Sequence, residues 1–315
     1  MKCKIVKVYA PASIANIGVG FDVLGVALDE PGDYVIAKRL KKKQFEFSVE
    51  TNVEDIPVSI EQNIAACVAI HMIKQLNVDF GVDLILHKMM SVGTGLGSSA
   101  ASSVASAVAI NALLPKPLSK LELLPFAVFG ERVASEYAHA DNVAPILFGG
   151  ACVIRNEIPL DVIPFEVHPS ITWIVVTPKI SILTVKARGI LPSLVSLSDV
   201  ARQMGNMTGF VLGLMRGDAN LIQRCMVDHI AEPYREKLIP GFYAVKNAAL
   251  EAGAVACGIS GSGPAMFAIT LSKDRVDNIA ASMIEAFQID ASLGSDCYIS
   301  QTNNVGATIV WEKGE

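Results

Sequence analysis

Three alternating glycines constrain this chain most. Gly93, Gly95 and Gly97 stand between residues 80–90, which alternate in strand fashion, and residues 100–114, a run of mostly small and apolar residues that predicts a buried helix. Glycines in such a turn leave successive N–H groups free to converge on an anion, and the helix N-terminus adds partial positive charge. The pattern indicates a phosphate-binding loop. A turn that merely lets the helix pack close to the strand is the alternative for an isolated glycine motif.

Two common nucleotide-binding motifs do not fit this loop. A Walker A loop needs Gly-Lys-Ser/Thr, but Ser98 follows Gly97 and the loop contains no lysine. A dinucleotide fingerprint starting at Gly93 needs glycine at position 98 and an acidic residue about 20 positions on, where only residues 112–115 stand. What remains is a loop whose serine hydroxyls can reach Mg²⁺, an ion that favours oxygen ligands and usually takes one or two carboxylates.

Composition and charge exclude several other classes of protein. The formal charge is −5 and there is no long Lys/Arg stripe, so we expect no nucleic-acid partner. No apolar run reaches the roughly 18 residues that span a bilayer, so we expect no membrane partner. The first residues enter a strand without the regions of a signal peptide, and the six cysteines contain no C-x-x-C pair. These features predict a cytoplasmic protein with reduced thiols.

The length of 315 residues predicts two lobes with a cleft between them. Three prolines, at positions 159, 164 and 169, favour a boundary near residue 165, which gives lobes at 1–165 and 166–315. The mixture of strands and helices is typical of an α+β fold. The apolar share of 51% also hints at a self-association surface, and a homodimer is one expectation.

Two segments of the N-terminal half are predicted in more detail. Residues 3–10 read as a strand, and residues 11–22 read as a functional loop of small residues. Glu122 lies three residues after Ser119, which is the spacing of a capping box and predicts a helix from Ser119 to about Tyr137. We expect this helix to turn Glu131 toward the core together with its apolar side chains Phe126, Phe129 and Val133.

Three motifs resemble those of the GHMP kinase family. Residues 91–101 read SVGTGLGSSAA, beside the family's central Pro-x-x-x-Gly-Leu-Gly-Ser-Ser-Ala-Ala, and only the leading proline is absent. Residues 11–22 (PASIANIGVGFD) and 258–264 (GISGSGP) match the first and last family motifs, in the family's order. The resemblance implies a two-lobe α+β fold, with a left-handed βαβ unit in the N-terminal lobe and a ferredoxin-like sandwich in the C-terminal lobe. It also implies transfer of the γ-phosphate of ATP to a small alcohol, with Mg²⁺.

The first motif and the segment 139–145 narrow the substrate. Mevalonate-type members carry Pro-Gly-Lys where this chain has residues 11–13, Pro-Ala-Ser. Residues 139–145 (HADNVAP), followed by the glycine pair 149–150, are similar to the members of the family that phosphorylate homoserine. A kinase for another small alcohol, such as a mevalonate-pathway or sugar substrate, is one alternative. A non-catalytic metabolite-binding regulator on the same fold is the other.

The resemblance also assigns residues to ligands. Those around the nucleotide are Asn63, Lys88, Gly93, Gly95, Leu96, Gly97, Ser98, Ser99 and Thr184. Those around the amino-acid substrate are Asn16, Asp22, His139, Asn142, Arg188, Arg235 and Gly261. Glu131 would hold Mg²⁺ together with Ser98 or Ser99. Arginine suits the substrate carboxylate because its planar fork binds a carboxylate in bidentate fashion.

The catalytic group implied by the resemblance is Glu131, Asn142 and Arg188. Asn142 occupies the position where mevalonate-type kinases place a catalytic aspartate, and asparagine cannot accept a proton as a base. A loose phosphoryl-transfer transition state makes early deprotonation unnecessary, so the proton can pass to the phosphate. In this interpretation Asn142 orients the hydroxyl. Asp141 as a general base is the alternative.

Overall fold

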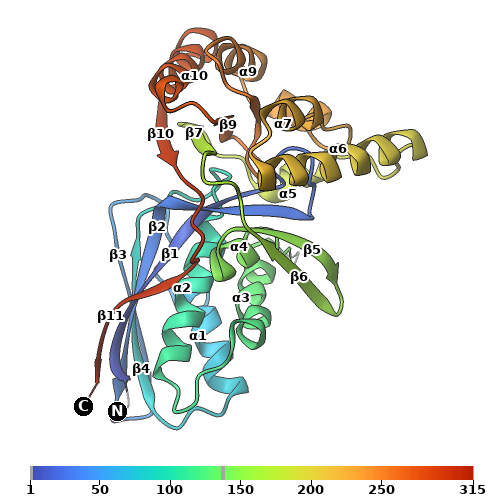
Figure 1. The fold of residues 1–315 in the computed structure, drawn as a ribbon. Coiled ribbons are helices and arrows are strands. Elements are labelled where there is room, and N and C mark those ends of the chain that lie inside the picture. The colour runs from blue at the N-terminus through green and yellow to red at the C-terminus, as the bar shows by residue number, and fades with distance from the viewer. Residues whose placement is uncertain (1–2, 136–138, 315) are drawn as a thin grey trace.

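The computed structural model describes residues 3–135 and 139–314, and places them in two lobes (Figure 1). The N-terminal lobe has a seven-stranded sheet, whose main path runs in the order β11-β1-β2-β4-β3, with β5 added to β2 and β6 added to β5. Its strands are β1 (Cys3–Ala15), β2 (Leu24–Leu40), β3 (Phe45–Thr51), β4 (Gly81–Lys88), β5 (Ala151–Glu157), β6 (Leu160–Phe165) and β11 (Thr308–Gly314).

Helices α1 (Ile64–Gln75), α2 (Ser98–Leu113) and α3 (Lys120–Ser135) pack together on one face of this sheet, and α4 (Val143–Phe148) lies beside α2 (Figure 1). The strands β3 and β4 are parallel and α1 connects them, so these three elements form a βαβ unit. The resemblance implied such a unit, and its left hand stays a prediction.

Helix α2 is the centre of the N-terminal core. It contacts β1, β2, α1 and α3, and its small side chains let all four neighbours approach. Two of its buried serines satisfy their hydroxyls inside the protein, because Ser103 donates to the carbonyl of Ala127 and Ser106 to that of Ala65, each at 2.6 Å. The first residue of this central helix follows directly on the glycine loop.

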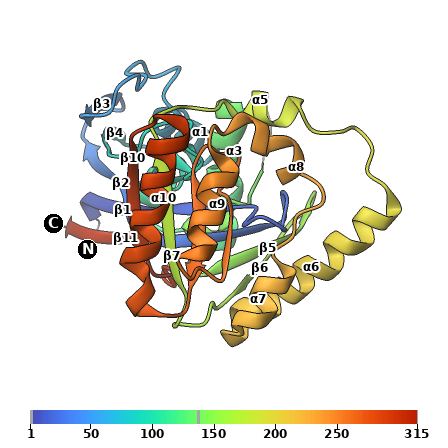
Figure 2. The same ribbon diagram turned by 90° about the horizontal axis from the view of Figure 1, so that it is seen from above.

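The C-terminal lobe has the predicted ferredoxin-like sandwich. Its strands β7 (Thr172–Pro178), β8 (Ala256–Ile259), β9 (Met266–Thr270) and β10 (Ser295–Ser300) are antiparallel and run in the order β10-β7-β9-β8. Helix α9 (Phe242–Glu251) connects β7 to β8 through preceding helices, α10 (Val276–Ala291) connects β9 to β10, and the two lie side by side (Figure 2). The preceding helices are α5 (Thr184–Gly189), α6 (Leu197–Arg216), α7 (Ala219–Cys225) and α8 (Glu232–Arg235).

Several elements depart from the sequence expectations. Strand β1 continues to Ala15, because Ser13 still pairs with Ala27 beyond a register shift, so the functional loop begins only at Asn16. The capping box at Ser119 and Glu122 is confirmed, and the predicted end of that helix near Tyr137 lies outside the described residues. Val133 does not face the core, since 39% of its surface is exposed.

The end of the chain returns to the N-terminal lobe. Strand β11 pairs with β1 along the edge of the large sheet, so residues 308–314 share a sheet with the first residues. The boundary near residue 165 stays a prediction for the division earlier in the chain. The chain therefore passes between the lobes twice, in the segment 166–171 between β6 and β7 and in the segment 301–307 between β10 and β11.

Candidate active site

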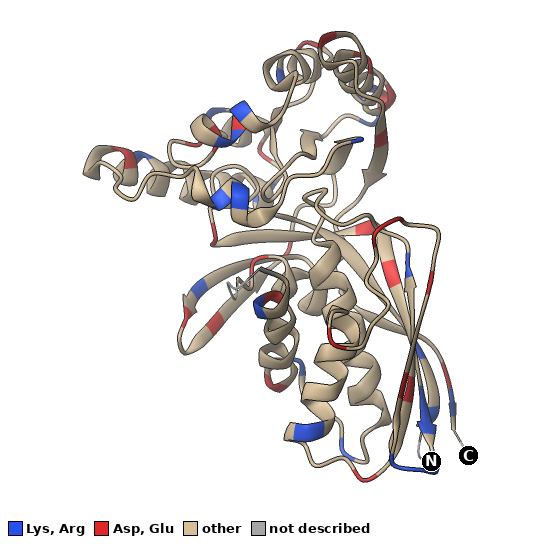
Figure 3. Cartoon of the chain, turned by 180° about the vertical axis from the view of Figure 1, so that it is seen from behind, with Lys and Arg blue, Asp and Glu red and all other residues tan. Residues whose placement is uncertain are grey.

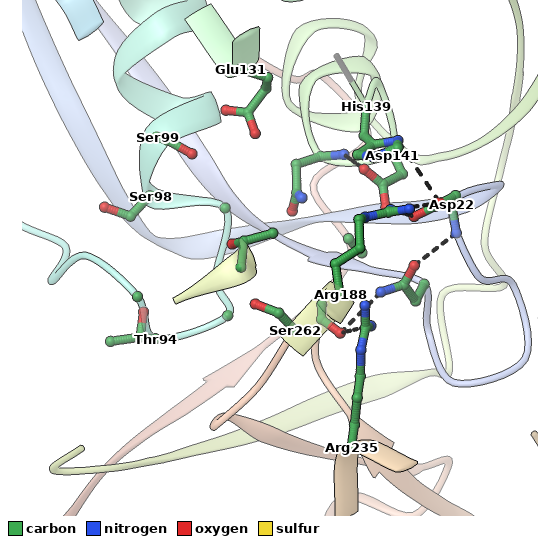
Figure 4. A pocket seen from close by; sticks show the side chains of 18 residues that line it. Asp22, Thr94, Ser98, Ser99, Glu131, His139, Asp141, Arg188, Arg235 and Ser262 are labelled. Carbon is green, nitrogen blue, oxygen red and sulfur yellow. Dashed lines mark hydrogen bonds and ion pairs between the residues drawn. The ribbon is translucent and has the colours of Figure 1, made fainter. Parts of the chain in front are cut away.

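A pocket of about 700 Å³, including its open mouth, brings together most of the predicted site residues (Figure 4). One end is formed by the glycine loop, Ser99 and Glu131, and the other by acidic and basic side chains from both lobes. The lining residues are Ala15, Asn16, Asp22, Gly93, Thr94, Gly95, Gly97, Ser98, Ser99, Glu131, His139, Asp141, Asn142, Thr184, Arg188, Arg235, Gly261 and Ser262.

The carbonyl groups of the glycine loop are turned toward the protein. Four consecutive carbonyls, those of residues 93–96, each accept a hydrogen bond from a different segment of the chain. In loop order the donors are the N–H of Ile182 at 3.1 Å, the N–H of Ala265 at 3.0 Å, the hydroxyl of Ser260 at 2.6 Å and the N–H of Ser13 at 3.1 Å. A carbonyl held in this way does not repel a bound anion, so the loop presents its electropositive side to the pocket.

Gly95 and Gly97 need to be glycine for two reasons. Both have left-handed φ values, +89° and +66°. A Cβ on Gly95 would lie 2.5 Å from the carbonyl oxygen of Ser260, and a Cβ on Gly97 would lie 2.3 Å from the hydroxyl of Ser13. Gly97 is also the N-cap of α2, and no side chain among the described residues caps that helix. The first N–H groups of α2 are therefore available to a phosphate.

Ser98, Ser99 and Glu131 differ in what they offer to a metal ion. The Ser98 hydroxyl donates to the carbonyl of Met90 at 3.1 Å, whereas the Ser99 hydroxyl is hydrogen-bonded to Glu131. Figure 4 shows Ser99 and Glu131 at the same end of the pocket. Burial raises the pKa of Glu131 to about 7, although the bond from Ser99 opposes this rise. A cation would relieve that cost, so the Glu131 carboxylate and the Ser99 hydroxyl fit a Mg²⁺ that takes its remaining ligands from phosphate and water.

The opposite end of the pocket holds a charge cluster. Arg188 donates to both carboxylate oxygens of Asp22, at 2.7 and 2.6 Å, and the His139 ring nitrogen Nδ1 lies 3.9 Å from the same carboxylate. Arg235 is buried and donates from its guanidinium to the carbonyl of Gly261 at 2.9 Å. Both guanidiniums lie near the Phe21 ring, about 5 Å from its centre.

Asn16 joins the first and last motifs. Its side-chain amide donates to the carbonyl of Gly261 at 2.9 Å and accepts from the N–H of Asp22 at 2.8 Å. Asn16 and Asp22 both have positive φ values, +63° and +57°, so this turn is strained and is held by those contacts. The turn thereby aims the Asp22 carboxylate into the pocket.

Asp141 and Asn142 lie side by side between the two ends. The Asn142 side-chain oxygen accepts from the Ser13 hydroxyl at 2.8 Å, which leaves the amide nitrogen as the group that Asn142 can offer a ligand. Burial, with Asp22 nearby, raises the pKa of Asp141 to about 7, while His139 opposes the rise. Asp141 thus lines the pocket as a carboxyl group that titrates near neutral pH.

Three residues expected at the nucleotide have other surroundings. Asn63 caps α1, because its side chain accepts from the N–H of Ala65 and donates to the carbonyl of Pro57. The Lys88 ammonium is buried against Asp33, and the Leu96 side chain is buried in the N-terminal core. These three do not line the pocket. Conversely, Thr94 and Ser262 line it, and their positions inside the central and last motifs were the only sequence signal for them.

Charge is distributed without one dominant sign. Figure 3 shows Lys and Arg interspersed with Asp and Glu over both lobes. Within the described part of the chain, no helix is long and apolar enough to cross a membrane, and no group of three or more His, Cys, Asp or Glu side chains is arranged to hold a metal. A metal in the pocket would therefore depend on its phosphate ligands as well as on Glu131.

Comparisons with known proteins agree with this geometry. The chain matches the GHMP kinases N-terminal domain over residues 63–150 and the GHMP kinases C-terminal domain over residues 210–289. It is 40% identical to the homoserine kinase of Chlorobium phaeobacteroides (strain BS1), over 98% of this chain and 100% of that protein. It is 38% identical to the homoserine kinase of Pyrococcus horikoshii, over 96% of this chain and 99% of that one.

Solved structures agree as well. The crystal structure of homoserine kinase from Cytophaga hutchinsonii superposes with a TM-score of 0.92 at 42% identity, over 98% of each chain. Mevalonate kinase of L. major, solved with R-mevalonate, has a TM-score of 0.70 at 15% identity, over 94% of this chain and 96% of that chain, and so shares the fold.

Proposed function

The chain belongs to the GHMP kinase family, and from this premise we infer that it transfers the γ-phosphate of ATP to the hydroxyl of L-homoserine. The product is O-phospho-L-homoserine, an intermediate of threonine biosynthesis. The observation that carries this function is a single pocket that joins an anion-binding glycine loop to the charge cluster of Asp22, Arg188 and Arg235. Homoserine carries an ammonium, a carboxylate and a primary hydroxyl, and the pocket offers a partner for each.

The triphosphate lies over residues 93–99 in this proposal. The loop carbonyls, which hydrogen bonds hold away from the pocket, and the uncapped N-terminus of α2 support that placement. Glu131 and Ser99 would hold a Mg²⁺ ion, and the chemistry that it would supply there is neutralisation of charge on the phosphate oxygens. Thr184 lines the pocket near the same loop and contacts the γ-phosphate.

Homoserine lies at the charged end. Its ammonium pairs with Asp22, which Asn16 and His139 hold in place, and its carboxylate binds Arg188 and Arg235. The Asp22 carboxylate and the Arg188 guanidinium already lie side by side. The pocket therefore offers a negative charge to the substrate ammonium and, next to it, a positive charge to the substrate carboxylate. A substrate without these charges, such as a sugar, would leave Asp22 and the arginines without a ligand partner.

The hydroxyl of homoserine lies against Asn142. The Ser13 hydroxyl fixes the Asn142 amide so that its NH₂ group donates to the reacting oxygen and directs a lone pair toward the γ-phosphate. The hydroxyl proton leaves to a phosphate oxygen as the new O–P bond forms and the bond to ADP breaks. Catalysis then depends on positioning and charge neutralisation.

A panel of alcohols tests the function. ADP formation, followed with a coupled assay, should require both Mg²⁺ and L-homoserine and should be absent with mevalonate or galactose. Turnover of another alcohol in place of homoserine would refute the substrate. Absence of ADP formation with every alcohol of the panel, together with tight metabolite binding, would favour the regulator instead. Glu131→Gln serves as the inactive control.

The cellular setting is a separate proposal. The cysteines whose side chains are described, from Cys67 to Cys297, are all free thiols, which supports an enzyme of the reducing cytoplasm. A homodimer remains our prediction, supported by half-exposed apolar residues on the edge strand β11, namely Ile309, Val310 and Trp311. Light scattering on the purified protein would measure its mass.

A further inference from the structure

A fully buried ion pair lies behind the glycine loop. Lys88 ends β4 and Asp33 lies in β2, their side chains are 4% and 0% exposed, and the Lys88 ammonium contacts the Asp33 carboxylate directly. Neither residue lines the pocket that holds the loop. A buried ion pair is a weak contribution to stability, because its desolvation cost rivals its attraction. Its hydrogen bonds to the surrounding backbone indicate another role.

The Asp33 end of the pair holds the start of the loop. The Oδ1 atom of Asp33 accepts the N–H of Met89 at 2.9 Å and the N–H of Met90 at 3.2 Å. These residues are the first two after β4, where the chain leaves the sheet to form the loop. The carboxylate thereby fixes the direction in which the loop begins.

The Lys88 end of the pair holds the end of the loop. The ammonium donates to the carbonyl of Ser98 at 2.8 Å and to the hydroxyl of Ser102 at 2.9 Å, and that hydroxyl donates to Asp33. Ser98 is the first residue of α2. The Ser98 hydroxyl donates back to the carbonyl of Met90, which closes a ring of contacts from the start of the loop to its end.

We propose that the Lys88–Asp33 pair is a positioning device for the phosphate-binding loop, which sets the separation of Met90 and Ser98 without contacting the nucleotide. Phosphate affinity depends on convergence of several N–H groups, and a shift of about 1 Å in such a constellation is costly. An apolar pair of the same volume would fill the space but would leave both ends of the loop without their acceptor and donor. The proposal rests on the nucleotide site assigned above and adds two residues that act through it.

The double variant Asp33→Asn/Lys88→Met tests the proposal, because it removes both charges together and so leaves no unpaired buried ion. Titration calorimetry with Mg·ADP should show nucleotide affinity weakened by about tenfold, while the KM for homoserine changes less than twofold. The milder Ser102→Ala keeps both charges, should fold, and should weaken Mg·ADP binding by about threefold. It provides the measurement if the double variant fails to fold.

Ser106→Ala is the matched control. It removes another buried hydroxyl of α2, whose partner is the carbonyl of Ala65 and which has no contact with the loop, and it should bind Mg·ADP like the wild type. Unchanged Mg·ADP affinity in the double variant or in Ser102→Ala would overturn the proposal. So would an equal rise in the homoserine KM, because that would indicate general loosening of the fold. Failure of the proposed function would show separately, as a wild type that binds Mg·ADP without phosphorylating homoserine.

Discussion

The guanidinium of Arg188 donates to both carboxylate oxygens of Asp22, at 2.7 and 2.6 Å, across 166 positions of sequence. Asp22 follows the first strand of the N-terminal lobe, and Arg188 lies on α5 in the C-terminal half. The pair therefore joins the two walls of the pocket at its charged end. Each member has roughly a quarter of its side chain exposed, so a ligand can reach both.

Asp22→Asn should raise the KM for homoserine by at least about tenfold, because the substrate ammonium loses its anionic partner. The value of kcat and the affinity for Mg·ADP should change less than threefold, since Asp22 lies at the end of the pocket away from the glycine loop. Steady-state kinetics with each substrate varied in turn measures the split. Asp296→Asn, which removes an exposed ion pair with Lys179, is the control and should behave like the wild type.

Arg235→Leu should raise the homoserine KM by about 100-fold while nucleotide affinity changes little, because a buried guanidinium that binds a carboxylate is worth about 2 to 5 kcal/mol. Arg235 is 4% exposed, so thermal unfolding must first show that the variant folds. Arg235→Lys keeps the charge without the planar fork and should give an intermediate KM. Equal losses of homoserine and nucleotide affinity would contradict the assigned role.

Much of this arrangement could be predicted from the sequence, because local patterns carried it. The glycine spacing at Gly93, Gly95 and Gly97 predicted the strand, loop and helix, and the capping box predicted the start of α3. Family motifs then brought residues from Asn16 to Arg235 into one pocket, a placement that no local periodicity can supply.

The sequence could not predict what is set by long-range contacts. The family resemblance assigned Lys88 to the nucleotide, but Asp33 in a neighbouring strand holds its ammonium inside the protein. Val133 fits a helical apolar pattern, yet its side of α3 faces solvent. The return of β11 to the first sheet likewise depends on pairing with β1 at the other end of the chain.

Glu131→Gln should remove part of the pH dependence of stability. Burial raises the pKa of Glu131 from 4.5 to about 7, so between these values the folded protein keeps a proton that the unfolded chain has released. Stability without ligand therefore falls as the pH rises through this window, and the fall should be smaller in the variant. Thermal unfolding between pH 5 and 8 measures it, with the exposed Glu285→Gln as control.

Mg·ADP should oppose the loss of folding stability that the wild type shows as the pH rises. The ionised Glu131 carboxylate is the proposed metal ligand, so stabilisation by Mg·ADP should grow as the pH rises through about 7 and should stay small at every pH in Glu131→Gln. Equal stabilisation of both proteins at pH 8 would remove Glu131 from the metal site.

Ser260→Ala should weaken Mg·ADP binding although Ser260 belongs to the C-terminal lobe. Its hydroxyl is the donor that holds the carbonyl of Gly95 at 2.6 Å, and without it that carbonyl can turn toward the phosphates. We expect affinity to fall by about five- to tenfold at a stability cost of about 1 to 3 kcal/mol. Calorimetry beside Ser106→Ala, a buried hydroxyl change of the same kind, separates the loop effect from lost stability. Unchanged affinity would show that the other three carbonyl contacts suffice.

Asp141→Asn and Asn142→Ala decide between the two ways of handling the hydroxyl proton. If Asn142 orients the hydroxyl and the phosphate takes the proton, Asn142→Ala should lower kcat by about 100-fold, and Asp141→Asn should lower it by less than about tenfold. A general base at Asp141 would predict the opposite order of the two losses, since losing such a base typically costs about 10²- to 10⁴-fold in rate.

The pH dependence of kcat gives a second test of Asp141. Burial raises the pKa of Asp141 to about 7, so a base there would give a kcat that falls below pH 7. This fall would disappear in Asp141→Asn. Single-turnover rates between pH 5.5 and 8.5 therefore distinguish the roles even if both variants lose activity. We expect the wild type and Asp141→Asn to share the same pH profile for phosphoryl transfer, because Asn142 has no proton to exchange in this range.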